Sequence, residues 1–463
     1  MTPHIAADPA LPLSGAIGAG LLLACALVLG GGGSPAPLPE LLLEWLALAV
    51  AAAWFLLPAT RDAWRKVPGA AWLVCLFAAA VPIVQLVPLP PALWHALPGR
   101  EAEIEALSLI GRQDTWRPLT MAADRTLASL LSLLPPLVLL VVVSTLPLRT
   151  RLVLALAVVL AGLASLTVGT IQLTASPDSL VQFYGVTTPT LRGFQANHNA
   201  TADLLLAALI GWVLAIRIAA IRGYLPNRAG PVLGLSALGI ALFSFGVFFT
   251  TSRMGIGLLP LAILAALALL KSWMPQLSRK TALGALALAA VLAIALVALL
   301  QLNPAMARIG QRFSFDKELR VELWKDGLYT ARKHYPVGVG MGNFVPALVA
   351  EERLEVVRPA MPNRAHNEYV ELSVEAGLFG LIAWAAVIAL IARAALQARL
   401  RANRSARAEA MFAGTVLAVL ALHSMVDYPF RSMALAAIGA LCAAMLLANP
   451  IPAFDRSNEK DHE

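Results

Sequence analysis

Long apolar runs recur along the whole of this chain and constrain its fold more than any other feature. A helix of about 20 mostly apolar residues spans the hydrocarbon core of a bilayer, and the chain holds about twelve runs of that length. The runs lie near residues 13–33, 38–58, 70–88, 125–146, 152–174, 200–221, 232–250, 255–271, 281–302, 368–393, 410–427 and 432–448. With 59% hydrophobic and 13% charged residues among 463, the composition exceeds what a soluble core needs. The sequence therefore predicts an all-α polytopic membrane protein with one transmembrane domain over residues 1–463.

Basic residues between the runs indicate the orientation of the chain. Lysine and arginine collect in short cytoplasmic loops, and here they collect in every second loop. They are Arg61, Arg65 and Lys66, then Arg149 and Arg151, then Arg217, Arg222 and Arg228, then Lys271, Arg279 and Lys280, and then Arg393, Arg399, Arg401, Arg404 and Arg407. We expect these loops and both termini to be cytoplasmic. The net charge of +8 then reflects the basic cytoplasmic loops. It does not indicate nucleic-acid binding, because no basic stretch has the interleaved aromatic residues of a nucleic-acid surface.

Two outer segments are too long to be turns, and we expect each to form a binding surface. Residues 88–124 mix apolar side chains with Glu and Arg and predict an amphipathic helix at the membrane interface. Trp94 and Trp116 suit the headgroup level there. Residues 303–365 form a large outer loop, in which the stretch 320–333 has apolar residues at helical spacing. These are Val321, Trp324, Leu328 and Ala331.

Three arginines stand at the outer ends of spans. Arg192 precedes the run at 200–221, Arg253 lies in a very short turn between two runs, and Arg364 ends the long outer loop. A charge near hydrocarbon is costly unless it is paired, hydrated or used. A guanidinium can bind a phosphate bidentately, and snorkelling to the headgroups is the ordinary alternative. We interpret the three arginines as one anion site.

His366 adjoins this anion site and is the candidate base, because an imidazole can take a proton from a hydroxyl at neutral pH. Glu375 lies nine residues further along the same expected helix, about 13 Å deeper at about 1.5 Å per residue. It is an intramembrane acid and needs a partner. Asp427 sits at the outer end of a late span, where pairing with Arg431 is the ordinary expectation.

Other reactive side chains are expected to be structural. His198 and His423 are assigned to packing. The three cysteines, Cys25, Cys75 and Cys442, lie in apolar runs without metal-ligand spacing, and no Asp-x-Asp pair lies on an outer loop. The sequence therefore predicts no metal site and no cofactor.

The residues around His366 resemble those of a known group, the O-antigen ligase family. That family's pattern is a His followed by Asn, Ser or Gln, then nine residues, then Gly-x-x-Gly. His366-Asn367, residues 368–376 and Gly377-Leu378-Phe379-Gly380 match it in full. The long outer loop upstream also matches, as do Arg192 after the preceding outer loop and Arg253 in a Thr-Ser-Arg-x-Gly turn. The resemblance is best over residues 190–430.

The resemblance implies a GT-C-like glycosyltransferase of the bacterial inner membrane, with its long helical loop and its active site in the periplasm. The outer segments 88–124 and 303–365 would then be periplasmic. The donor would be a glycan on undecaprenyl diphosphate, and the acceptor would be a sugar of a lipid A core. Membrane lipids would surround both substrates, and nucleic acid would play no part.

The resemblance also implies roles for the residues named above. The diphosphate would be bound by Arg192, Arg253 and Arg364. His366 would activate the acceptor hydroxyl, and direct displacement would invert the anomeric centre without a metal, because preorganised arginines stabilise the charge that grows on the leaving group. The supporting residues would be Asn367, Glu375 and Asp427.

Alternatives remain at the level of the acceptor and of the protein class. A polymerase of this family would use a lipid-linked repeat unit as acceptor, and an O-oligosaccharyltransferase would use a Ser or Thr of a protein. The full motif favours the ligase over the polymerase. The rival from another class is a lipid-linked sugar transporter, for which paired repeats and polar groups at the membrane midplane are typical.

Overall fold

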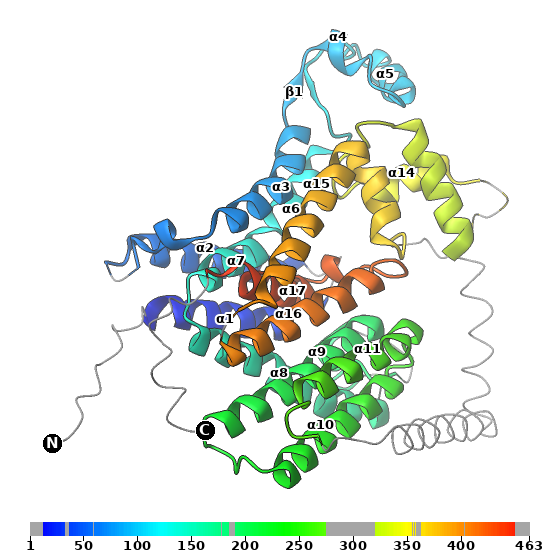
Figure 1. The fold of residues 1–463 in the computed structure, drawn as a ribbon. Coiled ribbons are helices and arrows are strands. Elements are labelled where there is room, and N and C mark those ends of the chain that lie inside the picture. The colour runs from blue at the N-terminus through cyan, green and yellow to red at the C-terminus, as the bar shows by residue number, and fades with distance from the viewer. Residues whose placement is uncertain are drawn as a thin grey trace.

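The computed structural model describes residues 13–32, 37–58, 60–176, 178–184, 190–274, 320–353, 355, 357, 363–401 and 403–449. Most of these residues are helical, and the helices form a bundle with a projecting hairpin at one end (Figure 1).

Seven helical runs among the described residues are long and apolar enough to cross a membrane, and four shorter apolar helices accompany them. The seven are α2 (Pro37–Leu56), the run Ala123–Ser144 formed by α6 (Ala123–Leu131) and α7 (Leu134–Ser144), α8 (Leu148–Thr174), α9 (His198–Ile221), α10 (Ala229–Phe249), α15 (Glu368–Ala398) and α16 (Arg404–His423). The four are α1 (Leu13–Leu29), α3 (Gly69–Gln85), α11 (Arg253–Leu269) and α17 (Met433–Leu447). Each expected run except 281–302 falls on one of these helices, and 281–302 lies outside the described residues. The described chain is thus a mostly helical membrane protein.

Helix α9 is the centre of one half of the bundle, where it packs against α8, α10, α11 and α16. Small residues allow these close approaches. A Cβ added to Gly162 of α8 would lie 2.4 Å from the Cβ of Ala208, and one added to Gly255 of α11 would lie 2.5 Å from the Cβ of Ala202. The start of α11 is therefore pressed against the start of α9.

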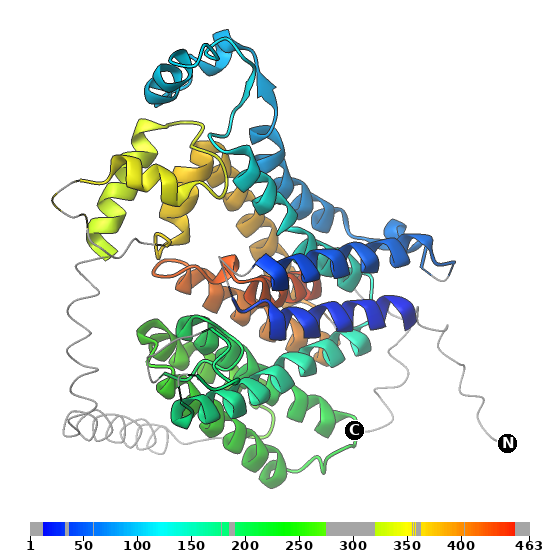
Figure 2. The same cartoon turned by 180° about the vertical axis from the view of Figure 1, so that it is seen from behind.

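The other half of the bundle combines helices from both ends of the chain. Helix α17 packs against α7, α1 and α16, α2 packs against α1 and α7, and α15 packs against α3. Seen from behind, α1 and α2 lie in front of α17, while α8 to α11 form the body below them (Figure 2). Helices α16 and α17 join the two halves, because α16 also contacts α9 and α11.

Residues 88–124 do not form the single amphipathic helix expected from their sequence. Two short strands, β1 (Pro88–Leu89) and β2 (Arg117–Pro118), pair antiparallel and enclose the short helices α4 (Pro91–Trp94) and α5 (Glu101–Ser108). Prolines in this stretch prevent one continuous helix. Trp94 is fully buried and donates its indole N–H to the carbonyl of Thr115 (3.0 Å), so its ring packs inside the protein, whereas Trp116 is exposed.

Residues 320–333 are helical, as their spacing predicts, but the buried face is not the expected one. Val321 and Leu328 are exposed. The buried positions of this helix are Asp326, Gly327 and Thr330. A Cβ added to Gly327 would lie 3.0 Å from Cγ1 of Val370, so the helix rests on the first turn of α15 and stabilises it there.

Helix α15 consists of two helical halves, residues 368–376 and 378–398, joined by a sharp bend. Gly377 has φ 56° and ψ −148°, a backbone conformation that side chains with a Cβ rarely adopt. A Cβ added to Gly380 would lie 3.4 Å from Cδ1 of Leu372, although residues eight apart in a straight helix are separated by about 12 Å. The chain therefore turns back at this glycine, and Figure 1 shows the two halves as separate helices.

The bend leaves backbone groups that need partners outside the helix, because no water is present in hydrocarbon to satisfy them. The carbonyl of Glu375 accepts hydrogen bonds from Nε2 of Gln85 (2.9 Å) and from the N–H of Gly340 (2.8 Å). The N–H of Leu378 donates to the carbonyl of Pro336 (2.9 Å). Glu375 thus lies at the bend. The expectation that it lies about 13 Å deeper in one straight span is wrong, because the helix turns back two residues after it.

Candidate functional site

The residues of the His-Asn-x9-Gly-x-x-Gly pattern each have a structural task. His366 has φ +48°, a left-handed conformation that is uncommon for a residue with a side chain and clusters at functional sites. Asn367 caps the first half of α15, because its Oδ1 accepts from the N–H groups of Tyr369 (3.0 Å) and Val370 (3.2 Å). Gly377 and Gly380 make the bend. The histidine is therefore held at the entrance of a short, anchored helix.

Asp427 orients the imidazole of His366. Its Oδ1 lies 3.1 Å from Nδ1 of His366, and its Oδ2 accepts from Nδ2 of Asn197 (3.0 Å) and of Asn199 (2.6 Å). The side chain of Asp427 is only 4% exposed, whereas that of His366 is 29% exposed. A carboxylate on Nδ1 keeps the proton on that nitrogen, which leaves Nε2 as the acceptor for a substrate proton.

Asp427 is ionised at neutral pH. Burial pushes its pKa upward, but the hydrogen bond and the charge of His366, together with His423 and Asn199, outweigh burial and bring the pKa to about 2. The pKa of Asp427 is lower in the folded protein than the ordinary value of about 3.9. The interactions of its carboxylate therefore stabilise the fold at every pH above about 3.9. The stabilisation is lost as the pH falls toward 2.

Arg192 lies in the turn that precedes α9. Its carbonyl accepts from Oγ1 of Thr201 (2.7 Å), and its Nε donates to Oγ1 of Thr190 (3.1 Å). Burial lowers the pKa of Arg192, although a guanidinium remains charged at any ordinary pH. An anion bound here would therefore compensate a charge that has lost part of its hydration.

Arg253 is the first residue of α11. Ser252 caps that helix by accepting the N–H of Gly255 (3.1 Å). The N–H of Leu191 donates to the carbonyl of Phe249 (3.0 Å), so the Arg192 turn lies beside the chain that leads to Arg253. The N-terminus of a helix favours a bound negative charge. An anion at the start of α11 would therefore be attracted by both the helix and the guanidinium of Arg253.

The start of α9 brings the predicted residues together. Asn197 and Asn199 bind Asp427, Thr201 binds the Arg192 turn, and the start of α11 packs on Ala202. His198, expected to be structural, lies within electrostatic reach of both Asp427 and Arg192. The segments that carry His366, Asp427, Arg192 and Arg253 therefore meet at the start of α9.

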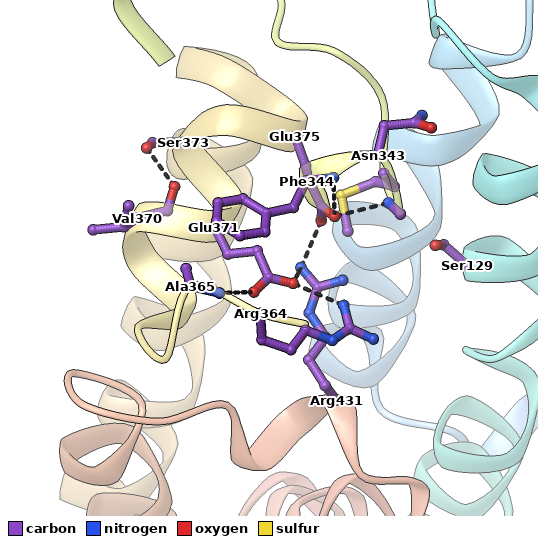
Figure 3. A network of polar contacts seen from close by, with 12 residues as sticks. Ser129, Asn343, Phe344, Arg364, Ala365, Val370, Glu371, Ser373, Glu375 and Arg431 are labelled. Carbon is purple, nitrogen blue, oxygen red and sulfur yellow. Dashed lines mark hydrogen bonds and ion pairs between the residues drawn. The ribbon is translucent and has the colours of Figure 1, made fainter. Parts of the chain in front are cut away.

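A second polar network holds Arg364, which was expected to join Arg192 and Arg253 (Figure 3). Nη1 of Arg364 pairs with Oε1 of Glu371 (2.8 Å), and the N–H of Ala365 donates to Oε2 of the same carboxylate (3.1 Å). Nη2 of Arg431 lies 3.5 Å from Glu371 and 2.6 Å from Oε2 of Glu375. Two buried carboxylates thus share two arginines beside the first half of α15.

Glu375 is held from both sides in this network. Besides the ion pair with Arg431, its Oε1 accepts the N–H groups of Gly342 (3.0 Å) and Phe344 (3.3 Å). Phe344 begins α14 (Phe344–Glu351), so the carboxylate ties the loop before α14 to the bend in α15. The expected partner of Asp427 was Arg431. That expectation is wrong, because Asp427 binds His366 and Arg431 binds the glutamates.

Residues 238–385 match the family model described as O-antigen ligase. This match supports the O-antigen ligase family. The matched O-antigen ligase region contains Arg253, Arg364, His366 and the bend at Gly377. Enzymes of this family resemble membrane glycosyltransferases and act on lipid-linked glycans. No curated protein matches the chain.

Several residues of the candidate site were not singled out from the sequence. Asn197 and Asn199 flank the ordinary-looking His198, and their Asn-His-Asn spacing was the available signal. Glu368 and Glu371 were also not singled out, although they recur with Glu375 at helical spacing, which indicates one acidic face. His423 pairs with Asp203 (2.7 Å), and both side chains are 1% exposed. Within the described residues, no group of three or more His, Cys, Asp and Glu could hold a metal.

Proposed function

We propose that this protein transfers a glycan from undecaprenyl diphosphate to a hydroxyl of a lipid A-core sugar. The observation that supports the proposal most is the His366–Asp427 pair, at 3.1 Å, beside the segments that carry Arg192 and Arg253. In this proposal about twelve spans cross the bacterial inner membrane in a GT-C-like arrangement. Both termini and the basic loops are cytoplasmic, and the site faces the periplasm.

The proposed reaction is one displacement. Nε2 of His366 takes the proton of the acceptor hydroxyl while the hydroxyl oxygen forms a bond to the anomeric carbon. The bond between that carbon and the phosphate oxygen breaks, and its electron pair leaves with undecaprenyl diphosphate. Because the oxygen attacks opposite the leaving group, the anomeric centre is inverted.

The arginines stabilise the leaving group in this scheme. Negative charge grows on the diphosphate as the bond breaks, and fixed guanidinium groups are worth most where charge develops in the transition state. Arg192 and Arg253 are assigned to this role. Asp427 keeps Nδ1 of His366 protonated and stabilises the imidazolium that forms. Arg364 is assigned elsewhere, because its guanidinium already binds Glu371.

The proposal is tested with purified full-length protein in detergent, supplied with undecaprenyl diphosphate-linked glycan and lipid A-core. The wild type is expected to form glycosylated lipid A-core. Arg253→Ala is expected to lower the rate about 100- to 1,000-fold, whereas Arg228→Ala, in an exposed loop between α9 and α10, is expected to leave it unchanged.

Other outcomes would identify other activities. Growth of the lipid-linked glycan without transfer to lipid A-core would indicate a polymerase. Transfer to a peptide Ser or Thr would indicate an oligosaccharyltransferase. Absence of product in detergent, with movement of the lipid-linked glycan across vesicle membranes, would indicate a transporter and overturn the enzymatic proposal.

A further inference from the structure

A cavity of about 510 Å³ lies between α3, α7, α15 and α17. Its walls are mainly apolar and include Phe77, Leu137, Trp384, Ala436 and Ala440. The volume is in the range of pockets that hold a small ligand or a segment of a larger one. An apolar cavity of this size in a membrane protein suits a hydrocarbon chain.

Charged side chains stand at one side of this cavity. Arg125, Arg364 and Arg431 line it, together with Glu40 and Glu368. Arg364 and Arg431 are bound to the glutamates of α15. Arg125 is exposed at the start of α6, and within the part of the chain that the structure describes no carboxylate pairs with it. Its guanidinium is therefore available for an anionic group outside the hydrocarbon.

Two chain segments connect the cavity to the candidate base. Asn363 and Arg364 line the cavity, and two residues later His366 binds Asp427. Likewise, Phe430 and Arg431 line the cavity a few residues after Asp427. Asp427 in turn binds the start of α9, where Arg192 and Arg253 lie. His366 is therefore connected to the cavity through residues 363–365, and to the segment of the arginines assigned to the diphosphate through Asp427 and the start of α9.

We propose that this cavity binds an acyl chain of the acceptor lipid, with an anionic group of that lipid on Arg125. The inference rests on the proposed function. In a direct displacement the attacking oxygen and the leaving group lie on opposite sides of the anomeric carbon. If Arg192 and Arg253 hold the diphosphate, the acceptor must reach His366 from the other side, and we assign the cavity to that side because residues 363 and 364 line it. An acyl chain in the cavity anchors the acceptor, and its sugar hydroxyl faces His366.

The test fills the cavity and compares two acceptors. Ala440→Phe places a ring among the apolar walls of α17. It is expected to raise the KM for lipid A-core about tenfold, because the ring displaces about two methylene groups. The KM for the same core oligosaccharide without its acyl chains is expected to stay unchanged. Ala237→Phe, at an exposed position of α10, is the matched control and is expected to change neither value.

The charged side of the cavity gives a second measurement. Arg125→Ala is expected to raise the KM for lipid A-core severalfold, with kcat unchanged, and Arg125→Lys is expected to restore most of the affinity. Neither variant is expected to change the KM for undecaprenyl diphosphate-linked glycan.

Three outcomes would overturn the inference. If Ala440→Phe raised only the KM for undecaprenyl diphosphate-linked glycan, the cavity would belong to the donor. If it raised the KM for the acyl-free acceptor equally, the effect would be a general distortion. If it changed no KM, the cavity would hold no substrate chain. Failure of the wild type to glycosylate either acceptor would instead overturn the proposed function.

Discussion

Two buried acidic regions flank His366, and they differ in the partners of their carboxylates. Near α9, Asp427 binds a histidine and two asparagines. Beside α15, Glu371 and Glu375 bind the guanidinium groups of Arg364 and Arg431. A carboxylate on an imidazole sets the tautomer of a base, whereas a carboxylate paired with arginine holds two segments together. We therefore expect substitutions in the first region to change activity and substitutions in the second to change stability.

His366→Ala is expected to have the largest effect on activity. Loss of the base should lower the rate of glycan transfer by about 100- to 10,000-fold. The midpoint of thermal unfolding in detergent should fall less than for Arg431→Met, because Asp427 keeps its hydrogen bonds from Asn197 and Asn199 when the imidazole is removed. An equal loss of stability and activity would contradict the comparison.

Arg431→Met is expected to have the largest effect on stability. It leaves Glu375 and Glu371 buried with one arginine between them, and breaking a buried pair costs about 3–5 kcal/mol. Thermal unfolding of the purified protein measures this loss. The double variant Arg431→Met, Glu375→Gln should recover part of it, because the uncompensated charge is removed. A stable Arg431→Met protein without activity would instead place Arg431 in the reaction.

Gly377→Ala tests whether the bend joins the two regions. The added Cβ would lie 2.1 Å from the carbonyl oxygen of Pro336, and the backbone conformation is strained for alanine. We expect a loss of at least about 1–3 kcal/mol in the free energy of unfolding. Gly257→Ala, in α11 with nothing within 4 Å of the added Cβ, is the control. Equal stability of both variants would show that the bend is not needed.

The pH dependence of stability should show the smallest effect. Because the pKa of Asp427 is held at about 2, its interactions contribute roughly 2 kcal/mol of stability above about pH 4. This contribution is lost as the pH falls toward about 2. Asp427→Asn should remove this part of the acid sensitivity, measured as the unfolding midpoint between neutral and acid pH. An unchanged acid profile would mean that His366 does not stabilise the charged carboxylate.

The sequence predicts the apolar helices well. A helix buried in hydrocarbon needs a continuous run of apolar residues, and this run can be seen in one segment of the sequence without knowledge of the other segments. The sequence also predicts one anion site of Arg192, Arg253 and Arg364 beside His366, whereas the structure pairs Arg364 with Glu371. The sequence does not predict which basic side chain each buried carboxylate binds. Asp427 is four residues from Arg431 and 61 residues from His366, yet it binds His366, because the start of α9 brings two asparagines to its other oxygen. Such choices depend on packing between distant segments.

The bend and the hairpin escaped prediction for related reasons. The apolar pattern of residues 368–393 is continuous across Gly377, so hydrophobicity alone indicates one span. The turn depends on a close approach to Pro336, which no local pattern reports. Residues 88–124 mix apolar and charged side chains, which predicts an amphipathic helix. The antiparallel pairing of Leu89 with Arg117 decides their structure instead.

The nine residues between His366-Asn367 and Gly377 correspond to two and a half turns of helix, at about 3.6 residues per turn. This length sets both the distance and the rotation between the imidazole and the bend. Adding or removing one residue would rotate the far end by about 100° and turn Glu375 away from Arg431. The number of variable residues in the motif therefore fixes the length of this helix and the angle between its two ends. This explains why the number of these residues can be constrained although their identity is not.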